Sequence, residues 1–195
     1  GLFQPLRGLI DRGRRKGLRS GRFLLLGSAS IELLRQSGET LAGRIAYAEL
    51  APLDATEVPQ ADLDKLWLRG GFPDSFLAKD DQASLRWRRD FIRTYLERDI
   101  PALGPRIAAE TLRRFWTMLA HRQSGLSNAA ELARALGVDA KTVASYLDLL
   151  VDLMLVRRLE PWHSNTGKRL VKSPRIYVRD TGILHALLGL TTLDD

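Results

Sequence analysis

The sequence predicts a mainly α-helical protein with a small, partial α/β element at its start and a winged helix-turn-helix in its C-terminal half. Three observations lead to this prediction. They are an apolar run typical of a buried strand, helical spacing of apolar residues between 61 and 123, and two short capped helices followed by basic, strand-like runs. We expect three parts: the α/β element at 1–60, a helical lid or linker at 61–105, and the winged helix domain at 106–195.

Composition narrows the classes of function before any motif is considered. The chain has 195 residues, 45% of them hydrophobic, which is enough for one or two domains. It has no cysteine, so disulfides, thiolate metal sites and cysteine nucleophiles are excluded. No apolar run reaches the roughly 20 residues of a membrane span and no signal peptide is present, so we expect a cytoplasmic protein without membrane contact. The net charge of +7 favours a polyanionic partner, although a solvated arginine-rich surface explains it equally well.

The α/β element is predicted from the order of segments in the first part of the chain. Residues 1–20 have a helical pattern that ends in a basic turn, and residues 21–30 form an apolar run that ends in small polar side chains. A helix is expected next at 30–36, followed by a second strand at 41–50. Ligands of α/β sheets bind beyond the carboxyl ends of the strands, which here means residues 27–30.

The middle of the chain is predicted to be helical. Residues 61–68 form a short helix ended by a Gly-Gly-Phe-Pro run, and residues 82–99 form a longer amphipathic one. Pro101 and the Gly-Pro pair at 104–105 mark a boundary. Residues 107–123 then form the first helix of the winged domain.

The winged helix-turn-helix is predicted from caps and turns. Ser127 and Glu131 have the spacing of a capping box, Gly137 ends that helix, and Asp139 caps a second one. Two helices joined by a tight turn with a glycine form a helix-turn-helix. A basic hairpin over residues 157–179 follows and completes the outline of a winged helix.

Two groups of residues in this domain are candidate contacts to double-stranded DNA. The start of the second helix meets base edges in helix-turn-helix proteins, and its outward positions here are Lys141, Thr142 and Ser145. The hairpin cations can neutralise phosphates, a contact that carries no sequence information. They are Arg157, Arg158, Lys168, Arg169, Lys172 and Arg175. Asp139 and Asp148 repel DNA, so sequence-specific reading has weak support. Winged helices also bind proteins, and a protein partner therefore remains an open alternative.

Six segments spread over nearly the whole chain carry a family resemblance. They are residues 21–30 (GRFLLLGSAS), 41–44 (LAGR), 70–73 (GGFP), 95–100 (YLERDI), 172–177 (KSPRIY) and 180–184 (DTGIL). Together they resemble the AAA-type ATPases of bacteria and archaea that carry a domain of unknown function 4143. The resemblance implies that Ser28 and Ser30 end a sensor strand beside a nucleotide and that Arg44 is an arginine sensor or finger. From the residues alone, the serines suit a tight turn and a helix cap, and Arg44 can instead cover the edge of the sheet.

The parts of that family which bind and hydrolyse ATP are missing from this sequence. It has no Gly-x-x-x-x-Gly-Lys-Ser/Thr loop and no acidic strand end for Mg²⁺. In the family these parts precede the position where this chain starts, and a nuclease-like region follows residue 190. We therefore expect a catalytically inactive fragment without a cofactor of its own, with ATP and Mg²⁺ bound by the intact parent. The alternatives are a free-standing winged-helix DNA-binding regulator and a protein-interaction scaffold.

No complete catalytic site and no metal site is predicted. His121, His163 and His185 lack the spacing of metal ligands, and no serine, histidine and acid fall together as a hydrolytic triad. A partial sheet exposes apolar surface and strand edges. We therefore expect self-association through residues 23–26 or through the first helix.

Overall fold

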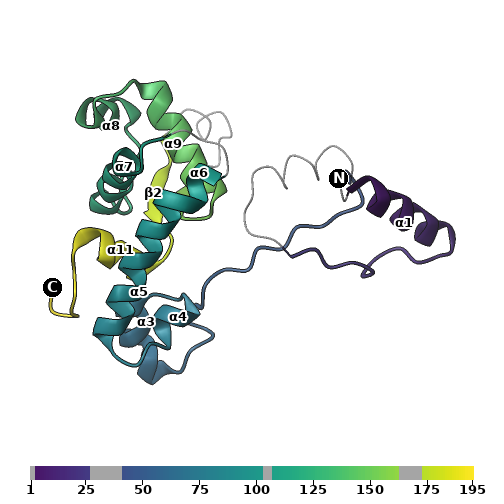
Figure 1. Ribbon diagram of the computed structural model, residues 1–195, viewed down its shortest axis with the longest axis horizontal. Helices are drawn as coiled ribbons and strands as arrows, with labels where there is room; N and C mark the ends of the chain where they lie inside the picture. The colour runs from purple at the N-terminus through teal and green to yellow at the C-terminus, as the bar shows by residue number, and fades with distance from the viewer. Residues whose placement is uncertain (1–2, 27–40, 103–106, 163–172) are drawn as a thin grey trace. The chain divides into compact units, whose positions relative to one another are not determined.

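The computed structural model of this protein describes residues 3–26, 41–102, 107–162 and 173–195. The chain divides into two compact units, Gly1–Leu50 and Ala51–Asp195, called here the N-terminal and C-terminal units. Across the described residues the protein is mainly α-helical, with one small antiparallel sheet of two strands (Figure 1). The expected fold class is confirmed in this coarse form.

In the N-terminal unit, α1 (Phe3–Arg15) is an amphipathic helix that packs against the turn beginning at Leu41. A small apolar cluster holds the helix and the turn together. Its buried members are Phe3, Leu6 and Leu41, with Ile10 and Ile45 packed beside them. The helix predicted at the start of the chain is therefore confirmed.

The two strands predicted in the N-terminal unit are absent from the described residues. Residues 21–26 and 41–50 form no strand pairing, and the side chains of Leu24 and Leu26 are 81% and 86% exposed. A continuous apolar run becomes a strand only where neighbouring strands take its hydrogen bonds and cover both of its faces. No described residue does this here, so the prediction of strands is wrong for these segments. The predicted helix at 30–36 lies outside the described residues.

The first half of the C-terminal unit contains η1 (Gln60–Asp62), α3 (Leu63–Arg69), α4 (Pro73–Phe76) and α5 (Asp81–Thr94). Asp80 caps α5 by accepting a hydrogen bond from the backbone N–H of Ala83. The helix continues as a π-helical turn, η2 (Tyr95–Asp99), and then as α6 (Ile100–Ala102). Pro101 explains the wider turn, because proline cannot donate to a carbonyl in the preceding turn and its ring needs room there.

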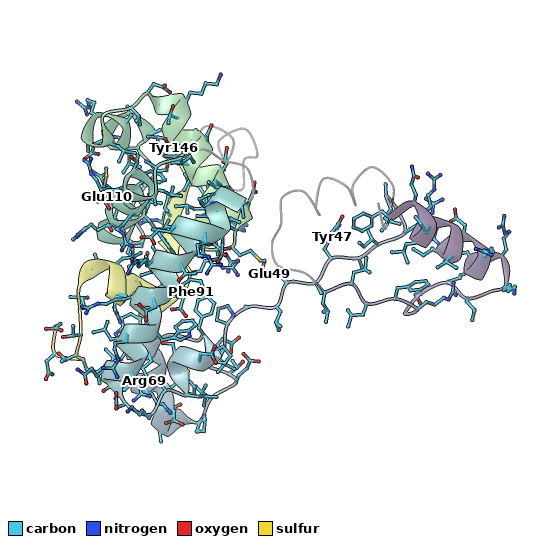
Figure 2. All side chains as sticks on the ribbon, viewed as in Figure 1. Tyr47, Glu49, Arg69, Phe91, Glu110 and Tyr146 are labelled. Carbon is cyan, nitrogen blue, oxygen red and sulfur yellow. The ribbon has the colours of Figure 1, made fainter. Side chains whose placement is uncertain are left out.

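The second half of this unit contains α7 (Ala109–His121), α8 (Ala129–Leu136), α9 (Ala140–Asp152), β1 (Val156–Leu159) and β2 (Arg175–Val178). We call the described part of residues 109–178 the helix–hairpin module. Its core lies between the three helices and the inner face of the hairpin. Members of this core are Leu112, Phe115, Trp116, Leu132, Leu147, Leu150, Val156, Ile176 and Val178. Tyr146 on α9 (Figure 2) closes one side of this core. Its ring meets that of Phe115 edge-on, with the centroids 5.9 Å apart.

The last helix, α11 (Thr181–Leu188), ties the two halves of the C-terminal unit together. It packs against α3, α5 and α7, and Figure 1 shows it lying beside α5. Because these helices come from both sides of the boundary predicted at residue 105, the C-terminal unit is one packed body.

Candidate nucleic-acid interface

Local side-chain caps set the positions of α8 and α9. Asn128 caps α8 by accepting from the backbone N–H of Glu131, one residue later than the predicted cap at Ser127. Gly137 ends this helix in the left-handed conformation (φ 78°, ψ 31°), which costs glycine little. Asp139 then caps α9, accepting from both the backbone N–H and the hydroxyl of Thr142 at 2.7 and 3.0 Å.

The sheet is wider than the predicted hairpin, because residues 124–127 run alongside β2, on the side of β2 away from β1. The N–H of Ser124 donates to the carbonyl of Ile176 at 2.9 Å, and the N–H of Ile176 donates back to Gly125 at 3.1 Å. The N–H of Ser127 donates to Pro174, and Leu126 forms a bridge with Arg175. These bonds explain why Ser127 does not cap α8. The sheet order is therefore 124–127, β2, β1, and the Ser-Gly-Leu-Ser sequence gave no periodic signal for it.

The exposed face of α9 carries few groups that are free to contact a ligand. Lys141 and Ser145 are exposed, as predicted. Thr142 is half-buried and its hydroxyl already serves the cap. Asp148 lies farther along the helix and binds the guanidinium of Arg158 at 2.6 Å. Lys141 is therefore the cation that α9 offers without an ion pair to another described residue.

The predicted hairpin cations differ in how available they are. Arg157 is exposed and stands opposite Tyr177 in the register. Arg158 is held by Asp148, and Arg175 donates to the carbonyl of Ser124. Lys168, Arg169 and Lys172 lie outside the described residues.

The outer face of the sheet mixes apolar and cationic side chains. Arg175 pairs with Leu126 on one side and with Leu159 on the other, and residues directly opposite in a sheet project to the same face. The two leucines are 60% and 48% exposed. Arg157 and Tyr177 form the next pair on this face, two residues from Leu159 and Arg175 along β1 and β2.

An ion pair and a helix cap lower the pKa values of two acids in the module, Glu131 and Asp139. Glu131 forms an ion pair with Arg122, whose hydrogen bond lowers the pKa of the carboxyl, while the same bond raises the pKa of Arg122. The hydrogen bonds from Thr142 lower the pKa of Asp139. The negative charge of Glu131 is thus offset by its partner, whereas that of Asp139 is directed at the first turn of α9.

The residues predicted to sense a nucleotide do not come together in the described structure. The Arg44 guanidinium binds both carboxylate oxygens of Asp11, at 2.7 and 3.3 Å, and joins α1 to the turn after Leu41. This bond lowers the pKa of Asp11. Ser28 and Ser30 lie outside the described residues.

A buried polar cluster in the C-terminal unit brings together two motifs that are far apart in sequence. Asp180, 7% exposed, caps α11 and accepts from the N–H groups of Gly71 and Ile183 at 2.7 and 2.8 Å. A side chain at Gly70 would collide with this carboxylate. Asp180 therefore caps α11 and at the same time ties this helix to the Gly70–Gly71 turn.

Arg88 is the central cation of this cluster and was not identified from the sequence. It is completely buried, and its Nη1 donates to the carbonyls of Leu68 and Gly182 at 2.9 and 3.0 Å. Burial lowers the pKa of Arg88 and raises the pKa of Asp180. Arg88 stands among other arginines on α5, so no sequence signal distinguishes it. The cluster joins α3, α5 and α11, and we interpret its role as structural: it holds these three helices together.

The part of the chain that the structure describes contains neither a helix that could span a membrane nor a group of side chains that could bind a metal ion. None of its helices combines the length and the apolar character needed to cross a bilayer. Its histidines and acids do not gather in groups of three that could hold a metal ion.

The fold and this surface define a mainly helical protein with a small basic hairpin. The chain belongs to the family described as Domain of unknown function (DUF8612), whose model matches residues 60–194. It is 50% identical over 189 residues to the uncharacterized protein Rv2008c of Mycobacterium tuberculosis and to the uncharacterized protein Mb2031c of Mycobacterium bovis. The match covers 97% of this chain but 42% of each relative, so the chain spans less than half the length of these relatives. No solved structure matches it.

These matches correct the sequence-based assignment to AAA-type ATPases with a domain of unknown function 4143. The family found is DUF8612, and nothing in the matches supports an AAA-type ATPase. The segments that carried the resemblance include helix ends such as Gly70–Pro73 and Asp180–Leu184, and such sequences recur in unrelated proteins because they end and cap helices. A nucleotide role for Ser28, Ser30 and Arg44 rested on that assignment and is not proposed.

Proposed function

We propose that the helix–hairpin module is a winged helix that binds nucleic acid, and that it binds mainly to the phosphate backbone. The observation that carries this proposal is the order of its elements. Helix α7, the strand-like segment 124–127, α8, α9 and the β1–β2 hairpin follow one another, and the first strand pairs with the last. This is the order of elements in winged helices, whose second and third helices form the helix-turn-helix.

The choice of phosphate over base edges follows from the composition of α9. Its exposed N-terminal half carries Lys141, which forms no ion pair with a described acid, although the cap Asp139 lies two residues before it. Apart from Lys141, the helix contains none of the residues that make two-pronged contacts to guanine or adenine, namely arginine, lysine, asparagine and glutamine. Arg157 adds a second available cation from the hairpin. Contacts of this kind add affinity that depends on salt and carries no sequence information.

A second candidate function is the binding of an acidic protein segment on the outer face of the sheet. The exposed side chains of Leu126 and Leu159, with Arg175 between them, favour it. A protein partner uses both the apolar and the cationic groups of this face, whereas a phosphate backbone uses only the cations.

The proposal is tested by titrating a duplex of arbitrary sequence, about 30 base pairs long, with the 195-residue chain at several salt concentrations. Affinity should fall linearly with salt on a log–log plot. The double variant Lys141→Gln/Arg157→Gln should lower the slope by about 2, because each phosphate contact contributes about 0.9.

The matched control is Lys79→Gln/Arg86→Gln, which removes the same two charge types from exposed positions outside the module. Its slope should equal that of the wild-type protein. Absence of binding at low salt, or equal losses in the two double variants, would contradict the proposal. Loss of acidic-peptide binding in Leu126→Gln/Leu159→Gln, with DNA binding absent throughout, would favour the second candidate.

A further inference from the structure

We propose that the end of α1 and the turn after it form a second surface for the phosphate backbone of nucleic acid, separate from the helix–hairpin module. We call it the basic turn and define it by Arg12, Arg15, Lys16 and Arg19. The inference rests on the proposed function, because it assigns the same type of polymer to a surface in the N-terminal unit.

The basic turn concentrates positive charge without nearby compensation. Residues 12–22 include Arg12, Arg14, Arg15, Lys16, Arg19 and Arg22, and no acidic residue. The acid that precedes them, Asp11, is occupied by the two-pronged bond from Arg44. Positive charge of this density, in a segment that contains no acid, attracts anions and is screened mainly by salt.

Most of these cations are not used by the N-terminal unit itself. Arg14 donates to the carbonyl of Gly43 at 2.9 Å, and Arg22 donates to that of Leu9 at 3.0 Å. The four side chains of the basic turn are exposed and have no hydrogen bond or ion pair with another residue that the structure describes. Their removal should therefore leave the fold of the unit intact.

The backbone beneath these cations is hydrogen-bonded. Gly17 takes a positive φ of 83°, its N–H donates to Arg14, and the N–H of Leu18 donates to Gly13, both at 3.0 Å. This is the Schellman arrangement that closes a helix C-terminus. A surface that is already formed loses less conformational entropy on binding than a flexible tail with the same charges.

Helix electrostatics alone do not account for the charges. Cations in the last turn of a helix are favoured by its dipole, which explains Arg12 and Arg15. Lys16 and Arg19 lie beyond the last helical residue, where this effect fades. The abundance of arginine also suits phosphate, because the planar guanidinium can bind two phosphate oxygens at once.

A basic amphipathic helix is also a feature of proteins that lie on anionic membranes. Here the apolar face of α1 is occupied, because Phe3 and Leu6 are buried against Leu41. These two side chains are therefore not available to acyl chains, which favours nucleic acid as the partner, and Leu9 is the residue of this helix that stays 42% exposed. The exposed side chains of Leu18 and Leu24 make a lipid control necessary.

The test uses the 195-residue chain and the same duplex of about 30 base pairs, titrated between about 50 and 200 mM salt. The variant Arg12→Gln/Arg15→Gln/Lys16→Gln/Arg19→Gln should lower the salt slope by about 3.6, at about 0.9 for each phosphate contact, whereas Arg12→Lys/Arg15→Lys/Arg19→Lys should keep most of it. Circular dichroism and thermal unfolding should match the wild-type protein in both variants.

The outcomes separate this inference from the proposed function. A loss confined to the fourfold variant supports the inference and refutes the role of the module, and a loss confined to Lys141→Gln/Arg157→Gln does the reverse. Losses in both support both, and absence of duplex binding refutes both. Binding to phosphatidylserine vesicles that the fourfold variant abolishes, with an unchanged duplex slope, overturns the inference in favour of a membrane surface.

Discussion

The C-terminal unit uses many of its arginines inside its own structure, whereas the cations of the basic turn form no ion pair with the described residues of the N-terminal unit. Arg88 is buried among carbonyl groups, and ion pairs hold Arg69 (Figure 2), Arg93, Arg122 and Arg158. Residues 1–50 contain nine basic and four acidic residues, against 21 and 19 in residues 51–195. Most of the net charge of +7 therefore belongs to the smaller unit. The net charge of the whole chain does not indicate which unit a polyanion would bind.

The largest effect should come from adding a side chain where α11 meets the backbone at the end of α3. In Gly182→Ala the new Cβ would lie 2.1 Å from the carbonyl oxygen of Arg69, so backbone must move. We expect a loss of about 3 kcal/mol in the free energy of unfolding, measured with urea. Gly189→Ala, at the C-terminal cap of the same helix, is the control, because its new Cβ meets no atom within 4 Å and strains only a positive φ, at about 1 kcal/mol. Equal losses of unfolding free energy in the two variants would show that the contact between Gly182 and the backbone of Arg69 is loosely packed.

Replacing the buried arginine should have the next largest effect. Arg88→Met leaves the carbonyls of Leu68 and Gly182 without this donor, and we expect the free energy of unfolding to fall by about 2 kcal/mol. Arg15→Met, in the basic turn, should change it by less than about 0.5 kcal/mol, because the side chain is exposed and unpaired. Similar values for the two variants would remove the contrast between the units.

The pH dependence of stability should distinguish two capping acids. Burial raises the pKa of Asp180, so the folded protein binds the carboxyl proton of Asp180 more tightly than the unfolded chain does. Proton binding therefore stabilises the folded state at low pH, and this stabilisation is lost as pH rises from about 3.8 through the raised pKa. The stability difference between wild type and Asp180→Asn should therefore shrink as pH rises. For Asp139→Asn it should grow, because hydrogen bonds lower the pKa of Asp139. Urea unfolding between about pH 3 and pH 7 measures both, and parallel curves would contradict these assignments.

The smallest effect is expected in the N-terminal unit. Asp11→Asn weakens the bond that Arg44 makes to α1, so the amide of Arg44, which donates to Leu41 at 2.8 Å, should exchange faster with solvent. Asp74→Asn, at an exposed position of α4, should leave this rate unchanged. Unchanged exchange in Asp11→Asn would show that the apolar cluster alone holds the turn.

Local chemistry made part of the structure predictable. Gly137, Asp139 and Asp180 end or cap helices through bonds to residues no more than four positions away, so their roles can be read from neighbouring residues. Asn128 rather than Ser127 caps α8, because both residues can cap and the sheet claims the backbone of Ser127. Such a choice depends on a partner that is distant in sequence.

The sequence by itself determined the longer helices α5, α7, α8 and α9, the helix end at Gly137, the cap at Asp139 and the existence of a hairpin, because apolar periodicity and capping act over a few residues. Only the tertiary structure decided that residues 124–127 join the sheet, that Arg88 is buried and that Arg44 binds Asp11. It also decided that residues 22–26 form no strand with described neighbours. An apolar run indicates that a segment is favoured in a buried position, but it does not indicate which other segments cover it. In the same way, a charged side chain does not indicate whether its partner is protein, water or ligand. Those partners are chosen by long-range packing.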